Sequence, residues 1–225
     1  YTDHPDNFLQ KHYQLLLNHS FSTAWNRNEA LHYTKGDGYY EEYKPGSSLV
    51  EYGLKPFNPD GTETNESDLV RQKKMDNKFG GGVFSLNYTG NRLTASLGGG
   101  LNQYRGNNFG KVTWVKNYIG NLSPEHEYYR NKSKKTDGNI YLKANYDLTS
   151  TLSAYADLQY RHIDYTIDGV NDKYDWNKHA LRPLAVDKKF DFFNPKVGLN
   201  WNITPNHRLY ASFSVAQKEP TRNNY

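Results

Sequence analysis

Apolar side chains alternate with polar ones along much of this chain, in paired runs separated by short turns. In residues 139–160 the even positions on either side of the turn carry Ile, Leu, Ala or Tyr, whereas the odd positions include Lys, Asn, Asp and Gln. A period of two places successive side chains on opposite faces of a β-strand. Folding this stretch at Ser150 sets Leu142 against Leu158 and Ile140 against Tyr160. The pattern therefore predicts an antiparallel hairpin with one apolar and one polar face.

The same pattern recurs around turns near 22–24, 89–92 and 204–206. In the hairpin at 89–92, the glycine triplets 80–82 and 98–100 are expected to face each other, leaving a patch of sheet without side chains. In total the chain is expected to form eight strands. Their approximate bounds are 11–21, 25–35, 69–88, 92–104, 128–148, 152–163, 190–203 and 207–217.

Long polar connections, at roughly 37–68, 106–127 and 165–189, alternate with these short turns. Outer-membrane β-barrels have this arrangement, with tight periplasmic turns and large extracellular loops. The pattern thus predicts an all-β, antiparallel transmembrane barrel segment whose apolar face meets lipid. A soluble β-sandwich would also alternate, since its apolar faces pack together. Strands of about ten residues, the segregation of the loops and the polarity of the second face favour the barrel.

A few residues do not fit this pattern. Arg27 and Glu29 fall on the apolar face, where a charge in mid-bilayer costs about 2–4 kcal/mol for Arg and less for Glu. We therefore expect a bulge between 25 and 31 that turns both side chains to the other face. Pro195 cannot donate a ladder hydrogen bond, so we expect it at a bulge or above the paired region.

Composition narrows the class of protein. The 225 residues are 36% hydrophobic and 15% aromatic, with 20 tyrosines, no cysteine and a net charge of +4. No apolar run is long enough for a membrane helix, and no basic stripe suits nucleic acid. Hydrolase, zincin and nucleotide-binding signatures are missing, so we predict neither an enzyme nor a cofactor. His162 and Asp164 share one strand face and form the sole hint of a metal or catalytic pair, although a solvated strand end explains them as well.

Two stretches carry a family resemblance: "KGDGYYEEYK" at 35–44, after "ALHYT", and "NHRLYASFSVAQKEPTRNNY" at 206–225, after "FFNPKVGLNW". With the rest of the chain, they resemble the β-barrel part of a TonB-dependent outer-membrane receptor of the Bacteroidetes type. The resemblance implies a barrel of 22 strands around an N-terminal plug that contacts TonB. Since neither a plug nor a TonB-contacting segment is recognised in this sequence, residues 1–225 are expected to be one barrel segment of a larger protein.

Ligand capture is expected at the long connections, on the extracellular side. Aromatic planes interleaved with cations there suit a flat, anionic or catecholate ligand such as a siderophore or haem, and aromatic faces also suit sugars. Packing of the loops against one another explains the same residues equally well. The candidates are Tyr39, Tyr40, Tyr43, Arg105, Trp114, Tyr118, Trp176, His179 and Arg182.

Three classes of function remain open from the sequence. The favoured one is TonB-energised import of a scarce nutrient, foremost an iron chelate, with a glycan as another possible cargo. The second is a passive porin or adhesin barrel, and the third is an outer-membrane enzyme that uses His162 with Asp164. Expected partners are outer-membrane lipid, TonB through the plug, and a small metal chelate or glycan, but no nucleic acid.

Overall fold

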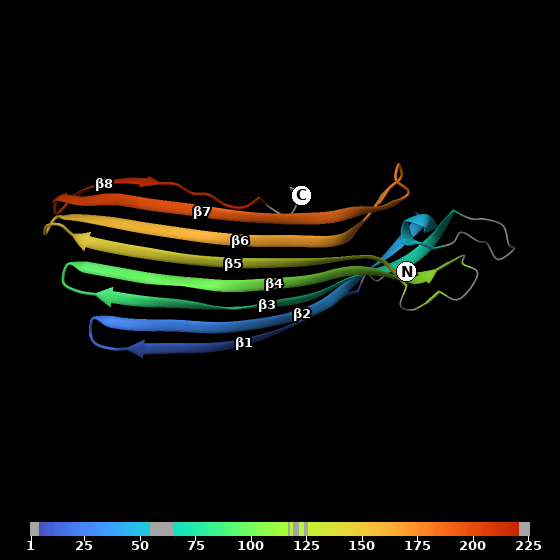
Figure 1. Cartoon of the computed structure of the whole chain (residues 1–225), viewed down its shortest axis with the longest axis horizontal. Helices are drawn as coiled ribbons and strands as arrows, with labels where there is room; N and C mark the ends of the chain where they lie inside the picture. Colours follow the sequence, from blue (N-terminus) through green and yellow to red (C-terminus); the bar gives the residue numbers. More distant parts are fainter. Residues whose placement is uncertain (1–4, 55–64, 117, 119–121, 124–125, 221–225) are drawn as a thin grey trace.

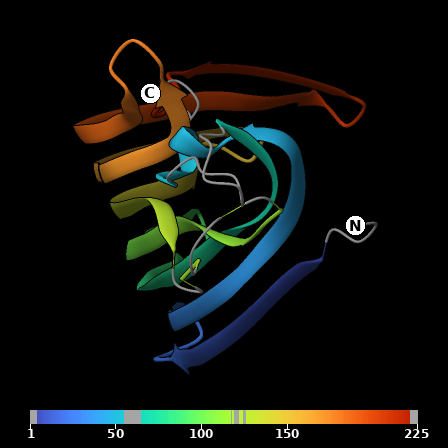
Figure 2. The same cartoon turned by 90° about the vertical axis from the view of Figure 1, so that its right-hand side faces the viewer.

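The chain folds into one antiparallel sheet of eight strands, each paired with its neighbours in the sequence. The computed structural model describes residues 5–54, 65–116, 118, 122–123 and 126–220. The strands lie side by side in Figure 1, and Figure 2 shows that the sheet is curved. The all-β antiparallel fold predicted from the sequence is confirmed. The elements are β1 (Asp6–Ser20), β2 (Trp25–Ser48), the 3-10 helix η1 (Leu49–Tyr52), β3 (Glu66–Thr89), β4 (Leu93–Val115), β5 (Glu127–Asp147), β6 (Leu152–Asp175), β7 (Ala180–Thr204) and β8 (His207–Ser214).

Four short turns gather at one end of the sheet, and the β2–β3, β4–β5 and β6–β7 connections lie at the other; we call these the turn end and the loop end (Figure 1). The first two loop-end connections are longer than the turns, whereas the one between β6 and β7 has only four residues. The predicted connections at 37–68, 106–127 and 165–189 are wrong in extent, because the strands continue far into them; residues 55–64 lie outside the described residues. With 24 residues, β3 is roughly 80 Å long at about 3.3 Å per residue. Cross-strand hydrogen bonds sustain the strands where both faces are polar and alternation no longer reveals them.

Strand pairing confirms the predicted register of the hairpin at 139–160. Leu142 pairs with Leu158 and Ile140 with Tyr160 between β5 and β6. Directly paired residues place their side chains on the same face of the sheet, so the apolar positions of all eight strands can be followed from one strand to the next. We call this face the outer face and the opposite one the inner face.

The apolar side chains of the outer face are uncovered. Ile140 is 49% exposed, Leu142 46%, Leu199 48% and Phe213 66%, so no second layer of the described chain shields them. A contiguous apolar surface of this kind is typical of a contact with lipid or with another protein. The β-sandwich alternative, in which these residues would pack in a core, is not the observed structure.

The glycine triplets do not face each other, so that expectation is wrong. Because Leu86 pairs with Leu97, Gly80–Gly82 lies opposite 101–103, and Gly98–Gly100 lies opposite 83–85. Gly81 nevertheless permits a close approach on the inner face. It sits between His32 and Asn102 in the pairing, and His32 Nε2 reaches Asn102 Oδ1 across it at 2.8 Å. A side chain at this position would block that contact.

Arg27 and Glu29 remain on the outer face, so the predicted bulge is wrong. The pairing of β2 with β1 and with β3 runs without a shift through both residues. Arg27 Nε lies 3.3 Å from Glu29 Oε1, and the Arg27 guanidinium lies 5.9 Å from the centre of the Phe21 ring. Both residues are close to the turn end, where long charged side chains can extend beyond an apolar band, so no bulge is required.

Pro195 pairs with Leu158 of β6 without a bulge. Its carbonyl accepts a hydrogen bond from the Val215 amide at 2.9 Å, and the pairing of β7 with β8 begins one residue later at Lys196. The missing amide hydrogen therefore falls at the end of the β7–β8 ladder, where it interrupts no pairing. Pro195 therefore lies at neither of the two expected positions on the side of β6, where it is paired without a bulge, and it lies above the paired region only on the side of β8.

The buried apolar core of the described residues lies at the loop end. There η1 and the chain after it pack on the strands, and the rings of Tyr52 and Tyr128 have centroids 4.8 Å apart. No helix in the described part of the chain is long and apolar enough to cross a bilayer. The cluster, which we call the loop-end core, consists of Leu49, Tyr52, Leu54, Leu69, Val112, Tyr128 and Tyr129.

Candidate functional site

A cavity of about 600 Å³ opens near the loop end, largely on the inner face. It combines apolar and aromatic side chains with amides and four charged residues, two acidic and two basic. A few polar groups among apolar ones are the usual composition of a small-molecule site. We call it the loop-end cavity. Its lining comprises Asp6, Asn7, Phe8, Gly38, Tyr39, Tyr40, Lys73, Lys74, Met75, Asn108, Tyr129, Asn131, Asn171, Asp172 and Leu184.

Two of the charged residues in the cavity form an ion pair between β3 and β6. Lys73 Nζ lies 2.5 Å from Asp172 Oδ2. Burial acts to lower the pKa of Lys73, but its hydrogen bond with Asp172, together with the charge of Asp172 and the effect of Tyr40, outweighs burial, and the pKa of Lys73 is raised. Burial acts to raise the pKa of Asp172, but the hydrogen bond from Lys73 and the charge of Arg71 outweigh it, and that pKa is lowered. Both groups are therefore charged at neutral pH.

Aromatic rings accompany the lysines beside the cavity. Lys73 Nζ is 5.9 Å from the centre of the Tyr40 ring, and Lys74 Nζ is 5.3 Å from that of Tyr39. These separations suit cation–π contacts. Tyr40 and Lys73 therefore offer a π-face and a cation on the inner face, whereas Tyr39 and Lys74 form their contact on the outer face.

A second ion pair ties the cavity to the loop-end core. Arg71 donates from Nε to Glu42 Oε2 at 2.9 Å and from Nη1 to the Tyr52 hydroxyl at 3.3 Å. The Arg71 side chain is only 12% exposed. Burial acts to raise the pKa of Glu42, but the hydrogen bond and charge of Arg71 outweigh it, and the pKa is lowered. Because Arg71 joins β2, β3 and η1, the core supports the strands that carry the cavity.

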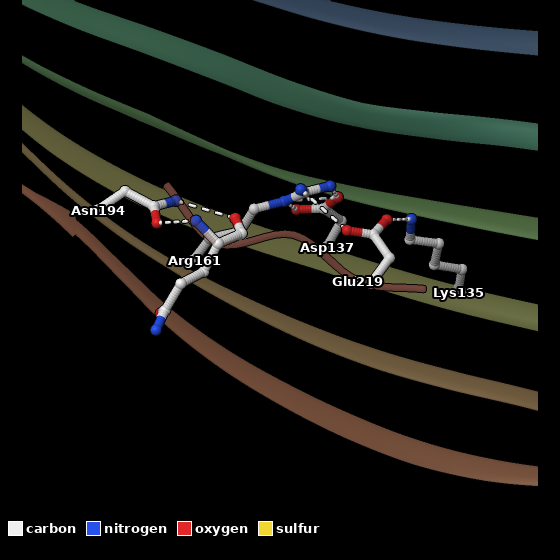
Figure 3. A network of polar contacts seen from close by, with 6 residues as sticks. Lys135, Asp137, Arg161, Asn194 and Glu219 are labelled. Carbon is white, nitrogen blue, oxygen red and sulfur yellow. Dashed lines mark hydrogen bonds and ion pairs between the residues drawn. The ribbon is translucent and has the colours of Figure 1, made fainter. Parts of the chain in front are cut away.

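A polar network lies closer to the middle of the inner face (Figure 3). Arg161 donates to Asp137 Oδ1 at 3.0 Å and to Glu219 Oε2 at 3.1 Å, and Glu219 also pairs with Lys135. Asn194 exchanges hydrogen bonds with the backbone of Gln217, accepting from its amide at 2.7 Å. These contacts hold the segment after β8 against β5, β6 and β7.

His162 and Asp164 do not form a site together. His162 Nδ1 lies 2.7 Å from Asp191 Oδ1, whereas Asp164 faces Lys189 at 3.8 Å. Among the described residues, no three His, Asp or Glu side chains converge as a metal site would require. His162 and Asp164 were the basis of the hypothesis of an outer-membrane enzyme, and their positions in the structure do not support it.

The comparison with protein families decides the class of the chain. The profile described as "TonB dependent receptor-like, beta-barrel" matches residues 1–225. The chain belongs to the TonB-dependent receptor β-barrel family. This family consists of outer-membrane receptors rather than enzymes, and membership places the exposed outer face in lipid.

Solved structures of this family share the fold. Two are crystal structures of the ferric-catecholate import receptor Fiu from E. coli K12, in an open and a closed form. Each is 14% identical to this chain with a TM-score of 0.65; the chain is covered to 97% and 99%, and the Fiu chains to 37% and 35%. The chain thus spans little more than a third of these receptors. No curated protein matches it.

The structure brings two of the predicted ligand-binding residues, Tyr39 and Tyr40, to the loop-end cavity. Tyr43 instead donates its hydroxyl to Asp68 at 2.7 Å. The other candidates lie apart from the cavity lining. Arg105 is within β4 on the outer face, Trp114 is near the end of β4, Tyr118 packs against the loop-end core, and Trp176, His179 and Arg182 lie at or beside the β6–β7 turn.

Sequence reasoning missed Lys73 and Asp172. Lys73 falls within a predicted strand, where its alternation with Arg71 and Met75 indicates a shared face. Asp172 was placed in a long connection, and nothing in the sequence pairs it with Lys73. Only the extension of β6 beyond its predicted end brings the two side chains together.

Proposed function

We propose that the protein containing this chain is an outer-membrane receptor that imports a scarce nutrient, foremost an iron chelate, with energy supplied through TonB. In this proposal residues 1–225 form one segment of a larger barrel of the 22-strand type, which also has a plug domain. The loop end faces the cell exterior. The family match supports the receptor role, and the runs at 35–44 and 206–225 support a receptor of the Bacteroidetes type.

The loop-end cavity carries the proposal of an iron chelate. Tyr40 offers an aromatic plane on the inner face, and Lys73 lies beside it as a partly buried cation. Tyr39 lines the same cavity, with its ring contact to Lys74 on the outer face. Planar catecholates stack on aromatic rings, and the negative charge of their ferric complexes is attracted to lysine. The Fiu receptors, similar in fold, are named as ferric-catecholate importers.

A glycan is the second candidate ligand, because the cavity also contains Asn108, Asn131 and Asn171. Amide side chains donate and accept hydrogen bonds, as sugar hydroxyl groups require, while tyrosine faces pack on sugar rings.

Passive conduction or adhesion is a further alternative. It requires no contribution from TonB, so genetic removal of TonB separates it from energised import.

Uptake by cells tests the class of function. Cells that depend on the full-length protein are grown on a ferric catecholate as the sole iron source, or on oligosaccharides as the sole carbon source, with and without functional TonB. We expect iron-dependent growth that is lost without TonB. Growth that persists without TonB would indicate a passive pore, and growth on oligosaccharides alone would assign the glycan.

Binding by the purified full-length protein tests the cavity. Tyr40→Ala is expected to weaken binding of a ferric catecholate roughly two- to tenfold, the equivalent of an aromatic contact of about 0.5–1.5 kcal/mol. Tyr155→Ala is the matched control, because Tyr155 lies on the inner face near the turn end, away from the cavity. Equal losses in both variants would remove the cavity as the binding site.

A further inference from the structure

Basic side chains form a continuous row across the outer face. Lys11 pairs directly with Lys35, Lys35 with Lys78, Lys78 with Arg105, and Arg105 with Lys134. We call these five residues the basic row. Like charges placed directly opposite in a sheet destabilise it, so a row of them calls for a compensating anion.

The described part of the chain places no such anion against the row. In the described ranges, no carboxylate oxygen lies within 4.0 Å of the cationic group of any residue in the row. Arg105, a member of the row, donates a hydrogen bond from Nε to the side-chain amide oxygen of Gln103 at 2.8 Å, and this partner is neutral. Each residue of the row is exposed. These charges are therefore available to a partner outside the described chain.

On β1 and β2 the row directly follows the apolar and aromatic part of the outer face, and exposed Leu9 lies one step beyond it. One outer-face step toward the turn end, Tyr13 pairs with Tyr33, and their rings stack with centroids 6.4 Å apart. The next step carries Leu15 and Leu31, which are 65% and 59% exposed. Each step is two residues, or about 7 Å. Apolar side chains, aromatic rings and cations thus follow one another in the order of acyl chains, interface and headgroups of a lipid leaflet.

A surface hollow of about 780 Å³ adjoins the row between β3 and β6. Lys78, Arg105 and Lys134 line it, together with Lys132 from one outer-face step further toward the loop end. Asp76 and Asp168 also line it but form no ion pair with these lysines in the described structure. The hollow can receive a group larger than a single ion, with its anionic part against the row.

We propose that the basic row and the hollow beside it bind the phosphate groups of a phosphorylated glycolipid headgroup in the leaflet at the loop end. Cations at a membrane surface attract anionic lipid by about 1 kcal/mol for each Lys or Arg. Arg105 adds a planar fork that suits phosphate oxygens. The proposal rests on the outer face lying in lipid and on the outward orientation of the loop end, and is independent of the imported ligand.

Lipid binding by the full-length protein in detergent tests the proposal without any iron chelate. The probes are fluorescent bisphosphorylated lipid A and the same lipid with both phosphates removed. The row variant combines Lys35→Gln, Lys78→Gln, Arg105→Gln and Lys134→Gln. The control variant combines Lys143→Gln, Lys173→Gln, Lys178→Gln and Lys196→Gln, which removes the same amount of charge from positions outside the row.

We expect the row variant to bind lipid A at least tenfold more weakly than the unaltered protein, and the control variant to bind it as the unaltered protein does. The phosphate-free lipid should bind as weakly to the unaltered protein as lipid A binds to the row variant. Should the row variant fail to fold, the two lipids still decide the matter on the unaltered protein. Equal binding of both lipids, or equal losses in both variants, would overturn the proposal.

Soluble phosphate is the other source of the same chemistry. If inorganic pyrophosphate displaces lipid A at equal concentration, the basic row binds a soluble anion, and the proposal of a lipid ligand is overturned. Uptake of a chelate is measured separately, so an intact lipid site in a protein that imports no chelate would refute the proposed function and leave this inference standing.

Discussion

At the turn end of the sheet the outer face is apolar and the inner face polar, whereas at the loop end both faces carry charges and the connections bury a small core. The first region is stabilised by hydrocarbon that the chain does not supply. The second resembles a water-soluble protein, with a fully buried Leu49 and ion pairs such as Arg71 with Glu42. The same continuous strands therefore lie in lipid at the turn end and in water at the loop end. The same substitution should have different consequences in the two regions.

The largest effect is expected in the loop-end core. Leu49→Ala removes a side chain with no exposed surface, which costs about 2–5 kcal/mol when the surroundings do not collapse into the space. Hydrogen exchange of the loop-end strands in the full-length protein measures the loss. Val50→Ala is the matched control, because Val50 is 39% exposed in the same helix. If Leu49→Ala loosened the turn end to the same degree, the two regions would not be separate units.

The next effect concerns the lipid-facing surface. Leu142→Arg places a charge on the outer face and is expected to cost about 2–4 kcal/mol near the bilayer midplane. Asn145→Arg, on the inner face of the same strand, should cost little. Urea-dependent folding of the full-length protein into lipid vesicles gives both values. Equal losses at the two positions would contradict the assignment of faces.

An intermediate effect is expected from the ion pair in the loop-end cavity. Asp172 has a lowered pKa, so its contribution to stability is complete above the ordinary value of 3.8 and is lost as pH falls through its folded value. Lys73 has a raised pKa, so its contribution is complete below 10.5 and disappears only at higher pH. Between these limits the pair contributes a constant stability.

Asp172→Asn should remove the acid-sensitive part of this stability and cost about 1.5–3 kcal/mol at neutral pH, the range for hydrogen bonds to charged groups. Hydrogen exchange of β3 and β6 as pH falls below the ordinary value of 3.8 measures it, and the variant should lose the acid dependence. Asp168→Asn is the control, because Asp168 is exposed and forms no ion pair within the described structure. An unchanged acid response in Asp172→Asn would assign the effect to another group.

The turn-end half of the fold could be predicted from the sequence because water and lipid impose a period of two on it. Pairs such as Leu142 with Leu158 follow directly from that alternation and from the position of the turn. At the loop end both faces meet polar surroundings, so the alternation fades although the hydrogen-bonded ladder continues. The strands were therefore predicted too short, as β6 shows by continuing to Asp175.

The candidate site was harder to predict for the same reason. Tyr39 and Tyr40 were recognised because aromatic residues in a polar segment stand out. The partnership of Lys73 with Asp172, in contrast, depends on strands that meet across the inner face, and a single sequence does not reveal it. The basic row is not visible in the sequence, because its members lie far apart in the chain and become neighbours only through the register of five strands.

The smallest expected effect marks the boundary of the apolar band at the turn end. Arg27 and Glu29 pair on the outer face with side chains 43% and 39% exposed, a geometry typical of interfacial ion pairs worth about 0–1 kcal/mol. A double-mutant cycle with Arg27→Leu and Glu29→Leu in vesicles should therefore give a coupling energy below about 1 kcal/mol, with little loss in the double variant. A coupling energy of several kcal/mol would show that the pair lies deep in hydrocarbon, because an unpaired charge is costly only there. The apolar band would then extend past Phe21 to the turn, and the division between the two regions would shift by the same distance along the sheet.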